Sequence, residues 1–333
     1  MTSAVEHLAW GMGSDASCLK VNESLPKRTL HSAHHVLIEV KAASINPIDY
    51  KLARGDFKGM VKGPFPHVVG SDVAGVVVEC GAEVTKLKVG DKVYSDAIGH
   101  GPLATICSVP SRLVSKMPSN CDFGECVGLP LAGLTAFQAL TAQAPGKTIQ
   151  GKNVLILGGS GGVGTLAIQL AKHCLGAKYV ATTSSNVELC KSLGADEVVN
   201  YKTDDLVSMM KDKQIDYIFD AVGGIDYWRQ GKQILKSKGK FTTISGDHDI
   251  SLPRSISRVI SRKFKSNFGN CNYHFFLTDA NAADLDKLTK FVEDGKLKQV
   301  TAEKFEGFTT ANVTGIFGKL IAGRSKGKLV IEF

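Results

Sequence analysis

The chain has 333 residues, a formal net charge of +8, 43% hydrophobic residues and eight cysteines. This length suits two domains that each bury a core, and no apolar run approaches the roughly 20 residues that a membrane-spanning helix needs. The first residues show no secretory pattern, and the cysteines form neither a C-x-x-C pair nor a regular framework. We therefore expect an intracellular protein with reduced thiols.

The first part of the chain is rich in strand signals. The runs HVLIEVKAA and VAGVVVECG are followed by the turn VGDKV and further short strands. From Gly124 onward helical and strand patterns alternate, which predicts a doubly wound parallel sheet of the α/β class with right-handed crossovers. The last stretch, TTANVTGIFGKLIAGRSKGKLVIEF, predicts a helix, a loop and a strand that rejoins the first domain. We place the β-rich domain at 1–124 and 272–333 and the α/β domain at 125–271.

The most informative segment is NVLILGGSGGVGTLAIQLAK, residues 153–172. An apolar strand at 154–157 leads into a glycine turn that fits G-x-G-x-x-G and then into a helical pattern. Such a turn lets the backbone approach a pyrophosphate, and the helix N-terminus attracts its charge. The sequence thus predicts a dinucleotide site, with an empty structural turn as the alternative. Its predicted contacts are Ser160, Gly161, Gly162 and Val163.

The next strand, KYVATT, indicates which dinucleotide binds. NAD sites usually carry an acid about 20 residues past the glycines, whereas this chain has Thr183, Ser184 and Ser185. Hydroxyls without a carboxylate favour the 2′-phosphate of NADPH over NADH. Lys191 and Tyr201 are further candidate contacts, or else an exposed helix lysine and a packed tyrosine.

Two later strands also end in small residues. The patterns YIFDAVGG and KFTTISG are expected to deliver Val222, Ser245 and Gly246 to the carboxyl edge of the sheet, where ligands of such sheets bind.

A basic segment follows the last of these strands. Arg254, Arg258 and Arg262 lie four apart with aliphatic residues between them. This spacing predicts an amphipathic helix whose cations are solvated, with contact to an anionic membrane surface or acidic partner as the alternative. The sequence has no aromatic-rich basic motif, so we expect no nucleic acid partner.

The order of motifs resembles the medium-chain dehydrogenase/reductase superfamily and, within it, the zinc-free quinone oxidoreductases, nearest to the plant-type chloroplast envelope homologues. The resemblance runs nearly end to end. It rests on AASINPIDYKLARGDF (42–57), FPHVVGSDVAGVVVECG (65–81), VGDKVY (89–94), LPLAGLTAFQAL (129–140), GGSGGVGTLAIQLAK (158–172), SLGADEVVNY (192–201), DAVGG (220–224) and GRSKGKLVIEF (323–333). It implies a GroES-like catalytic domain, a Rossmann NADPH-binding domain and a homodimer, joined through a strand near 265–270.

The chain departs from the zinc-containing members of this superfamily at their metal ligands. Where those members carry a first cysteine ligand it has Ile45–Asn46–Pro47, and where they carry Gly-His-Glu it has Gly70, Ser71 and Asp72. The four-cysteine structural loop is missing, because the region from Tyr94 to Pro110 holds only Cys107. His67 and His100 are interpreted as ordinary polar or packing residues. We therefore expect no metal.

The resemblance implies hydride transfer from NADPH to a quinone or an α,β-unsaturated carbonyl in a cleft between the domains. Asn46 and Tyr50 are expected on one wall, as hydrogen-bond donors or, for Tyr50, a stacking surface, with solvent as an alternative proton source. Thr135 matches a position near the nicotinamide, or is a helix threonine bonded to its own backbone. Asp72 is interpreted as a structural residue of the GSDVAG turn, with a catalytic acid as the alternative. Arg324 and Lys328 match a closing loop beside the cofactor, or are solvated cations.

Two other functions stay open at this stage. One is an enoyl-thioester reductase, which needs a cationic patch for which Arg258, Arg262, Lys263 and Lys265 are the candidates. The other is a nucleotide-gated, non-enzymatic protein that uses the basic segment 254–265 to bind a membrane or RNA surface. The default location is the cytoplasm, with a plastid or peripheral membrane location as the alternative.

Overall fold

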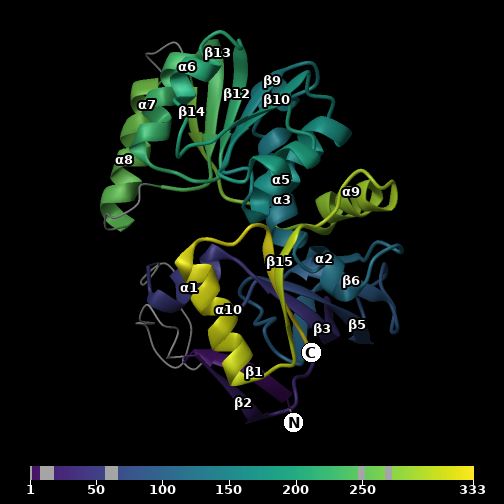
Figure 1. Cartoon of the computed structure of the whole chain (residues 1–333). Helices are drawn as coiled ribbons and strands as arrows, with labels where there is room; N and C mark the ends of the chain where they lie inside the picture. Colours follow the sequence, from purple (N-terminus) through teal and green to yellow (C-terminus); the bar gives the residue numbers. More distant parts are fainter. Residues whose placement is uncertain (1, 8–18, 57–66, 247–251, 267–271) are drawn as a thin grey trace. The chain divides into compact units, whose positions relative to one another are not determined.

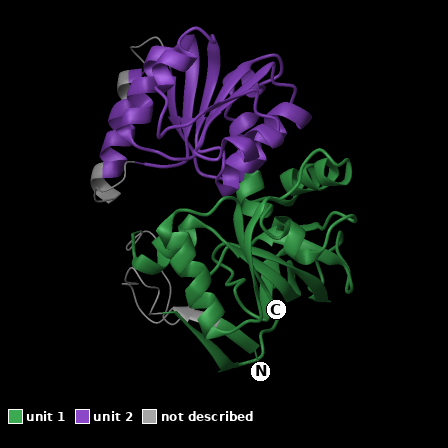
Figure 2. Cartoon of the chain, viewed as in Figure 1, with its two compact units in different colours: residues 1–134, 279–333 green, residues 135–278 purple. Residues whose placement is uncertain are grey.

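The computed structural model describes residues 2–7, 19–56, 67–246, 252–266 and 272–333. The chain divides into two compact units, residues 1–134 with 279–333 (unit 1) and residues 135–278 (unit 2), as Figure 2 shows. The chain therefore leaves and re-enters unit 1 at 134/135 and 278/279, later than the predicted 124/125 and 271/272.

Unit 1 is built on a seven-stranded sheet. Six strands follow the order β15-β16-β3-β5-β6-β8, and β7 pairs with β3. Their bounds are β3 His35–Ile45, β5 Asp72–Cys80, β6 Lys92–Asp96, β7 Ile106–Pro110, β8 Val114–Lys116, β15 Thr301–Glu306 and β16 Lys328–Glu332. A smaller sheet has the order β2-β1-β4, with β1 Thr2–His7, β2 Leu19–Leu25 and β4 His67–Val68.

Helices pack on these sheets (Figure 1). They are α1 Pro47–Arg54, the single-turn α2 Phe123–Cys126, α9 Ala282–Glu293 and α10 Thr310–Ala322, with a 3₁₀ turn at Ser111–Leu113. Because α2 packs against β3, β5 and β16, it stays with unit 1. Helix α3, Pro130–Leu140, begins in unit 1 and carries the chain into unit 2.

The core of unit 1 follows from strand alternation and one apolar helix face. Val36, Ile38 and Val40 of β3 point into one buried cluster, as period-2 burial requires. A second cluster joins Phe317 of α10 to the neighbouring strands. The final strand β16 pairs antiparallel with β3, with Leu329 opposite Ile45. The prediction that the C-terminal strand rejoins the first domain is confirmed.

Unit 2 holds a six-stranded, all-parallel sheet with the order β11-β10-β9-β12-β13-β14. The strands are β9 Asn153–Leu157, β10 Tyr179–Thr183, β11 Glu197–Val199, β12 Ile215–Asp220, β13 Leu235–Thr243 and β14 Asn272–Phe275. The helices are α4 Gly162–Gln169, which continues as a π-helix at Leu170–Cys174, then α5 Val187–Ser192, α6 Leu206–Met210, α7 Ile225–Ile234 and α8 Leu252–Ser266; a short 3₁₀ turn spans Pro145–Lys147. This is the predicted doubly wound α/β sheet.

The basic segment forms the predicted helix, α8, but its cations are not all solvated. Arg258 is exposed, whereas Arg262 is only 7% exposed and its guanidinium lies 5.8 Å from the centre of the Tyr273 ring. The predicted strand near 265–270 is wrong at its start, because residues 265 and 266 end α8. Its remainder lies outside the described residues.

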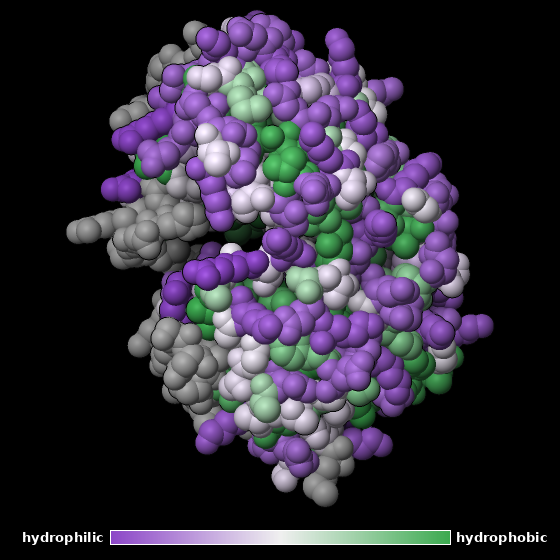
Figure 3. Space-filling view, in the orientation of Figure 1, coloured by the Kyte–Doolittle hydropathy of each residue, from purple (hydrophilic) through white to green (hydrophobic). Residues whose placement is uncertain are grey.

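One described stretch, Phe123–Leu140, is long and apolar enough to cross a membrane, contrary to the expectation from the sequence. However, 83% of it is buried inside the protein, as in a core helix. The face in Figure 3 is mostly hydrophilic, with small apolar areas scattered over it.

Candidate functional site

The glycine turn connects β9 to α4 at the carboxyl edge of the sheet in unit 2. Gly158 adopts the left-handed conformation at φ +88°, and a Cβ on Gly164 would lie 2.1 Å from the Gly158 carbonyl oxygen. Only glycine permits this approach of helix to turn. Helix α4 starts at N-cap Gly161 without a side-chain cap, so its first N–H groups point outward as an anion site requires.

Two neighbouring strand ends meet this turn. A Cβ on Gly158 would lie 2.7 Å from Val222 Cγ2, and one on Gly223 would lie 2.4 Å from the Gly246 carbonyl oxygen. Asp220 holds the loop after β12 by accepting from the N–H groups of Val222 and Gly223 at 2.9 Å each. The structure thus brings the predicted Val222, Ser245 and Gly246 beside the turn.

The three hydroxyl residues after β10 have different environments. Thr183 and Ser184 are both 1% exposed, and their oxygens accept from the N–H groups of Gly158 (3.0 Å) and Asn186 (2.9 Å). Ser185 is exposed and lies beside the Tyr201 hydroxyl, at 3.4 Å. Thr183 and Ser184 therefore shape the turn, and the accessible groups are Ser185, Lys191 and the half-exposed Tyr201.

In unit 1 a buried polar cluster forms where β3 ends and where β5 and β16 begin. Its members are Asn46, Asp49, Ser71, Asp72 and Lys328, all at most 4% exposed. The Lys328 ammonium donates to the Asn46 Oδ1 (2.5 Å), the Asp72 carboxylate (3.1 Å) and the Ile45 carbonyl (3.3 Å). The cluster is therefore organised around a buried ion pair.

The Asn46 amide is fully engaged in this cluster. Its Nδ2 group donates to Ser71 Oγ at 2.8 Å and to Asp72 Oδ2 at 2.7 Å, while its oxygen accepts from Lys328. An amide has only two N–H donors. The expected donation from Asn46 to a substrate stays a prediction, and it would require one of these bonds to break.

The contacts of Lys328 do not support the expected role in cofactor binding. An ammonium has three donors, and the three bonds of Lys328 go to Asn46, Asp72 and the Ile45 carbonyl. Lys328 is thus an internal counterion, not a solvated cation. The sequence could not show this, because a lysine near a glycine-rich loop has the same pattern in either role.

Two buried carboxyls near the ion pair have perturbed acidity. Burial raises the pKa of Asp49 to about 7, against opposing hydrogen bonds from the Asn46 N–H and Ser71 hydroxyl. Burial and the Asp72 charge raise the pKa of Asp96 to about 7. The Oδ1 atom of Asp49 is buried without a hydrogen-bond partner. The sequence did not identify Asp49 as a candidate site residue. The signal that could have indicated it is its position as the third residue of a helix that begins with proline.

Tyr50 and Thr135 lie in different units. Tyr50, in α1, is partly buried against the apolar cluster of α10, and the Arg54 guanidinium lies 5.5 Å from its ring centre. Thr135 is 2% exposed, and its hydroxyl lies 2.6 Å from that of Thr278. The hydroxyls of Thr135 and Thr278 therefore lie where the chain passes between the units. Their expected catalytic roles stay predictions.

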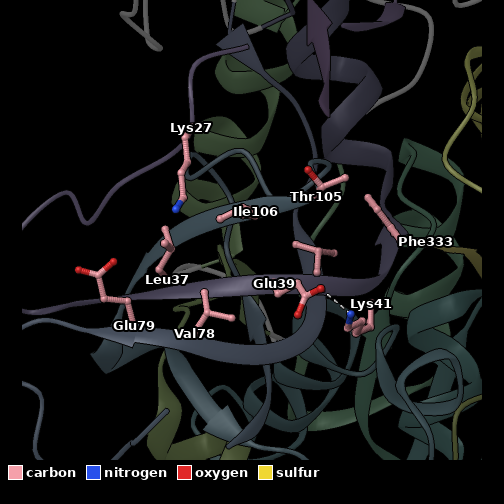
Figure 4. Close-up of a pocket in the computed structure, with 10 residues that line it drawn as sticks. Lys27, Leu37, Glu39, Lys41, Val78, Glu79, Thr105, Ile106 and Phe333 are labelled. Carbon is pink, nitrogen blue, oxygen red and sulfur yellow. Dashed lines mark hydrogen bonds and ion pairs between the residues drawn. The ribbon is translucent and has the colours of Figure 1, made fainter. Parts of the chain in front are cut away.

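Cavities among the described residues of unit 1 show where some of the predicted site residues lie. One of about 480 Å³ (Figure 4) lies among strands β3, β5 and β7, and two of its lining residues on β3, Glu39 and Lys41, form an ion pair at 2.7 Å. None of the predicted site residues lines it. The other, of about 440 Å³, lies between β15 and the end of α10 and is lined by Arg324, Ser325 and Lys326. Arg324 is exposed there, which suits the predicted contact with an anion.

The cluster in unit 1 includes Asn46, Ser71 and Asp72, from the two segments that the resemblance places where zinc-containing members have their ligands. Its side chains are an amide, a hydroxyl, carboxylates and an ammonium, and a lysine ammonium repels a metal cation. Among the described residues, no group of three or more His, Cys, Asp or Glu could hold a metal ion. The ring of His100 lies 5.8 Å from that of His35, and the side chain of His67 is not among those described.

Comparison with known proteins gives consistent matches along the chain. The alcohol dehydrogenase GroES-like domain matches residues 32–140, and the zinc-binding dehydrogenase domain matches residues 193–331. A 2-methylene-furan-3-one reductase of Solanum lycopersicum is 37% identical over 89% of this chain and 71% of its own length. A chloroplastic NADPH-dependent alkenal/one oxidoreductase of Arabidopsis thaliana is 37% identical with the same coverage. The solved quinone oxidoreductase of Coxiella burnetii is 30% identical, with a TM-score of 0.81 over 100% of this chain and 99% of its own.

The buried ion pair makes a prediction for stability. Lys328→Met leaves the Asp72 carboxylate buried without its counterion, so the free energy of unfolding should fall by about 3–5 kcal/mol in chemical denaturation. The neutral double variant Lys328→Met/Asp72→Asn should recover part of this loss. Arg324→Met, at an exposed cation, should change stability by about 0.5 kcal/mol or less. A loss below about 1 kcal/mol in the single variant would contradict the role of Lys328.

The raised pKa of Asp49 predicts a pH dependence of stability. Since the folded protein holds this proton up to about pH 7 and the unfolded chain loses it near pH 4, Asp49 lowers the free energy of unfolding as pH rises between these values. Asp49→Asn should therefore gain stability relative to the wild type from about pH 5 to about pH 8, measured by urea denaturation. Asp212→Asn, at an exposed position, should keep a constant difference from the wild type.

Proposed function

Because this chain belongs to the quinone oxidoreductase family of the medium-chain dehydrogenase/reductase superfamily, we propose that it is an NADPH-dependent reductase of α,β-unsaturated carbonyls and quinones. The alkenal/one oxidoreductase and furanone reductase relatives, each 37% identical, support the enone class. The Coxiella burnetii structure supports quinones. The observation that carries the proposal is the glycine turn. Its close backbone contacts are possible only for residues without a Cβ atom.

Residues of unit 2 fit the cofactor. The uncapped start of α4 and the backbone of Ser160, Gly161 and Gly162 would bind the pyrophosphate, and Val222 with Ser245 and Gly246 would border the nucleotide. Ser185, Tyr201 and Lys191 would contact the 2′-phosphate, since they are accessible and residues 184–187, directly after β10, include no carboxylate. When bound, NADPH supplies the hydride.

Residues of unit 1 would provide the surroundings of the acceptor. Hydride addition to a conjugated carbon moves negative charge to the carbonyl oxygen, which needs hydrogen-bond donors and then a proton. We propose the Tyr50 hydroxyl as donor, since both N–H groups of Asn46 are engaged within the cluster. We also propose that the reaction needs no metal, because the Lys328 ammonium already places a positive charge in that cluster, where the Asn46 Oδ1 and the Asp72 carboxylate accept its hydrogen bonds.

The alternative of an enoyl-thioester reductase has less support. Of its candidate cations, Arg262 is turned against Tyr273, and the side chain of Lys265 is not among those described. Arg258 and Lys263 remain exposed for this role or for contact with an anionic membrane.

Assembly and location remain proposals. The strand β14 ends the described parallel sheet, and we propose a homodimer joined along it. The cytoplasmic location stays a prediction, and the chloroplastic relative supports the plastid alternative.

The proposed activity predicts NADPH oxidation with small conjugated acceptors. The purified chain should oxidise NADPH, followed by absorbance, when offered a short 2-alkenal or a flat quinone. Its kcat/KM should be at least about tenfold lower with NADH. A metal chelator should leave the rate unchanged. Oxidation with none of the acceptors would contradict the proposal, and preference for an enoyl thioester would support the alternative.

The proposed 2′-phosphate contact predicts a change in cofactor preference. Ser185→Asp places a carboxylate beside the phosphate, so kcat/KM for NADPH should fall about tenfold or more while that for NADH is retained. Ser208→Asp, at an exposed serine of α6, adds the same charge to unit 2 and should preserve the preference. An unchanged preference in Ser185→Asp would remove Ser185 from the site.

A further inference from the structure

Three imidazoles of unit 1 lie in a row, apart from the glycine turn and the buried polar cluster. The ring centres of His31 and His35 are 5.8 Å apart, with the ring planes tilted by 30°. The ring centres of His35 and His100 are also 5.8 Å apart, in an edge-to-face arrangement. His31 precedes β3, His35 is its first residue, and His100 lies between β6 and β7. The row therefore joins two segments that are far apart in the sequence.

Hydrogen bonds to one serine of β7 fix the first two members of the row. The Oγ atom of Ser108 lies 3.2 Å from His35 Nδ1 and accepts from the backbone N–H of His31 at 3.1 Å. His35 and His100 are partly buried, whereas His31 is exposed. The first two imidazoles are therefore attached to the sheet, and the third packs against them from a loop.

The loop that carries the third imidazole, residues 97–105, packs on the segment that leads into the buried polar cluster. The N–H of Ala97 donates to the Ser71 carbonyl at 2.7 Å, and the N–H of Leu103 donates to the Val69 carbonyl at 3.1 Å. Ser71 is a member of the cluster. A movement of this loop would therefore be felt at the cluster.

The groups that act on the row by their charge are cations or become cations when protonated. In the described part of the chain, the groups that act on His35 are His31, His34 and Arg112. Those that act on His100 are Arg112 and the other two imidazoles of the row. Burial and these charges lower the pKa of both His35 and His100. A proton on one ring therefore opposes a proton on the next.

We propose that His31, His35 and His100 form an acid-sensitive latch on the loop 97–105. When the three rings are neutral, they pack against one another and hold the loop beside the start of β3. When they take up protons from the solvent, they repel one another and release the loop. The latch thus connects the pH of the surroundings to the segment that borders the buried cluster.

One carboxyl at the start of the loop titrates in the opposite sense. Asp96 accepts from the N–H of Ile98 at 3.3 Å, and its pKa is raised to about 7, so its proton stabilises the fold as the pH falls. The imidazoles of lowered pKa do the reverse. Below about pH 6.5, the ordinary pKa of histidine, the unfolded chain binds more protons than the folded one and stability is lost. A test of the latch must therefore keep Asp96 and change only the imidazoles.

Amide hydrogen exchange of the full chain, followed by mass spectrometry of peptides from the loop 97–105, measures the release. Protection is compared at pH 7.5 and pH 5 after correction for the intrinsic exchange rate. The loss of protection at pH 5 should be at least about threefold larger in the wild type than in His35→Gln/His100→Gln, which keeps Asp96. His173→Gln, in unit 2, should behave as the wild type. An equal loss in the wild type and the double variant would overturn the proposal.

Titration of the imidazole signals by NMR tests the repulsion separately. In the wild type, His35 and His100 should titrate below about pH 6.5. In His100→Gln the midpoint of His35 should rise, because one of its repelling neighbours is gone, whereas His173→Gln should leave that midpoint unchanged. A His35 midpoint that does not respond to His100→Gln would overturn the latch. If a variant fails to fold, titration of the wild-type His35 and His100 at or above about pH 6.5 would do the same.

Discussion

The buried pair of Lys328 and Asp72 is the constraint on which unit 1 depends. The two residues start β16 and β5, 256 positions apart in sequence, and their charged groups lie 3.1 Å apart with at most 4% exposure. A buried charge without a partner is far less stable than one that is paired. The pair therefore specifies one register, in which Leu329 lies opposite Ile45 and Ser44 lies opposite Asp72.

The same cluster sets what chemistry unit 1 can perform. Together with the neighbouring Asp96 it combines three buried carboxyls with one ammonium, so full ionisation would leave excess negative charge, and Asp49 and Asp96 instead hold protons up to about pH 7. The hydrogen bonds of Asn46 are used to satisfy these groups. The cluster thus acts mainly as a framework that fixes α1 and with it Tyr50. The hydrogen bond to the carbonyl oxygen of the substrate therefore has to come from a group other than the Asn46 amide.

Much of the fold could be predicted from the sequence, because it depends on local patterns. The apolar run of β9, the glycine turn and the helical spacing of α4 are contiguous, and so is the alternation that predicts the parallel sheet. The buried cluster could not be predicted, since it needs the register between three strands far apart in the chain. For the same reason the sequence left Lys328 with two alternatives, a contact beside the cofactor or a solvated cation, and neither of them includes the buried ion pair. The burial of Arg262 could not be predicted either. Helical spacing shows which residues share a face of the helix, but it does not show that the ring of Tyr273 packs against that face.

The two passages between the units show how the framework of unit 1 connects to the sheet of unit 2. The N–H of Leu131, in the first turn of α3, donates to the second oxygen of Asp72 at 2.8 Å, so the start of this helix is held by the buried ion pair. One turn later Thr135 begins unit 2, and its hydroxyl lies 2.6 Å from that of Thr278, the last residue of that unit. The entry and exit of unit 2 are thereby joined to each other. Helix α3 therefore runs from the contact with Asp72 in unit 1 to the threonine pair at the start of unit 2.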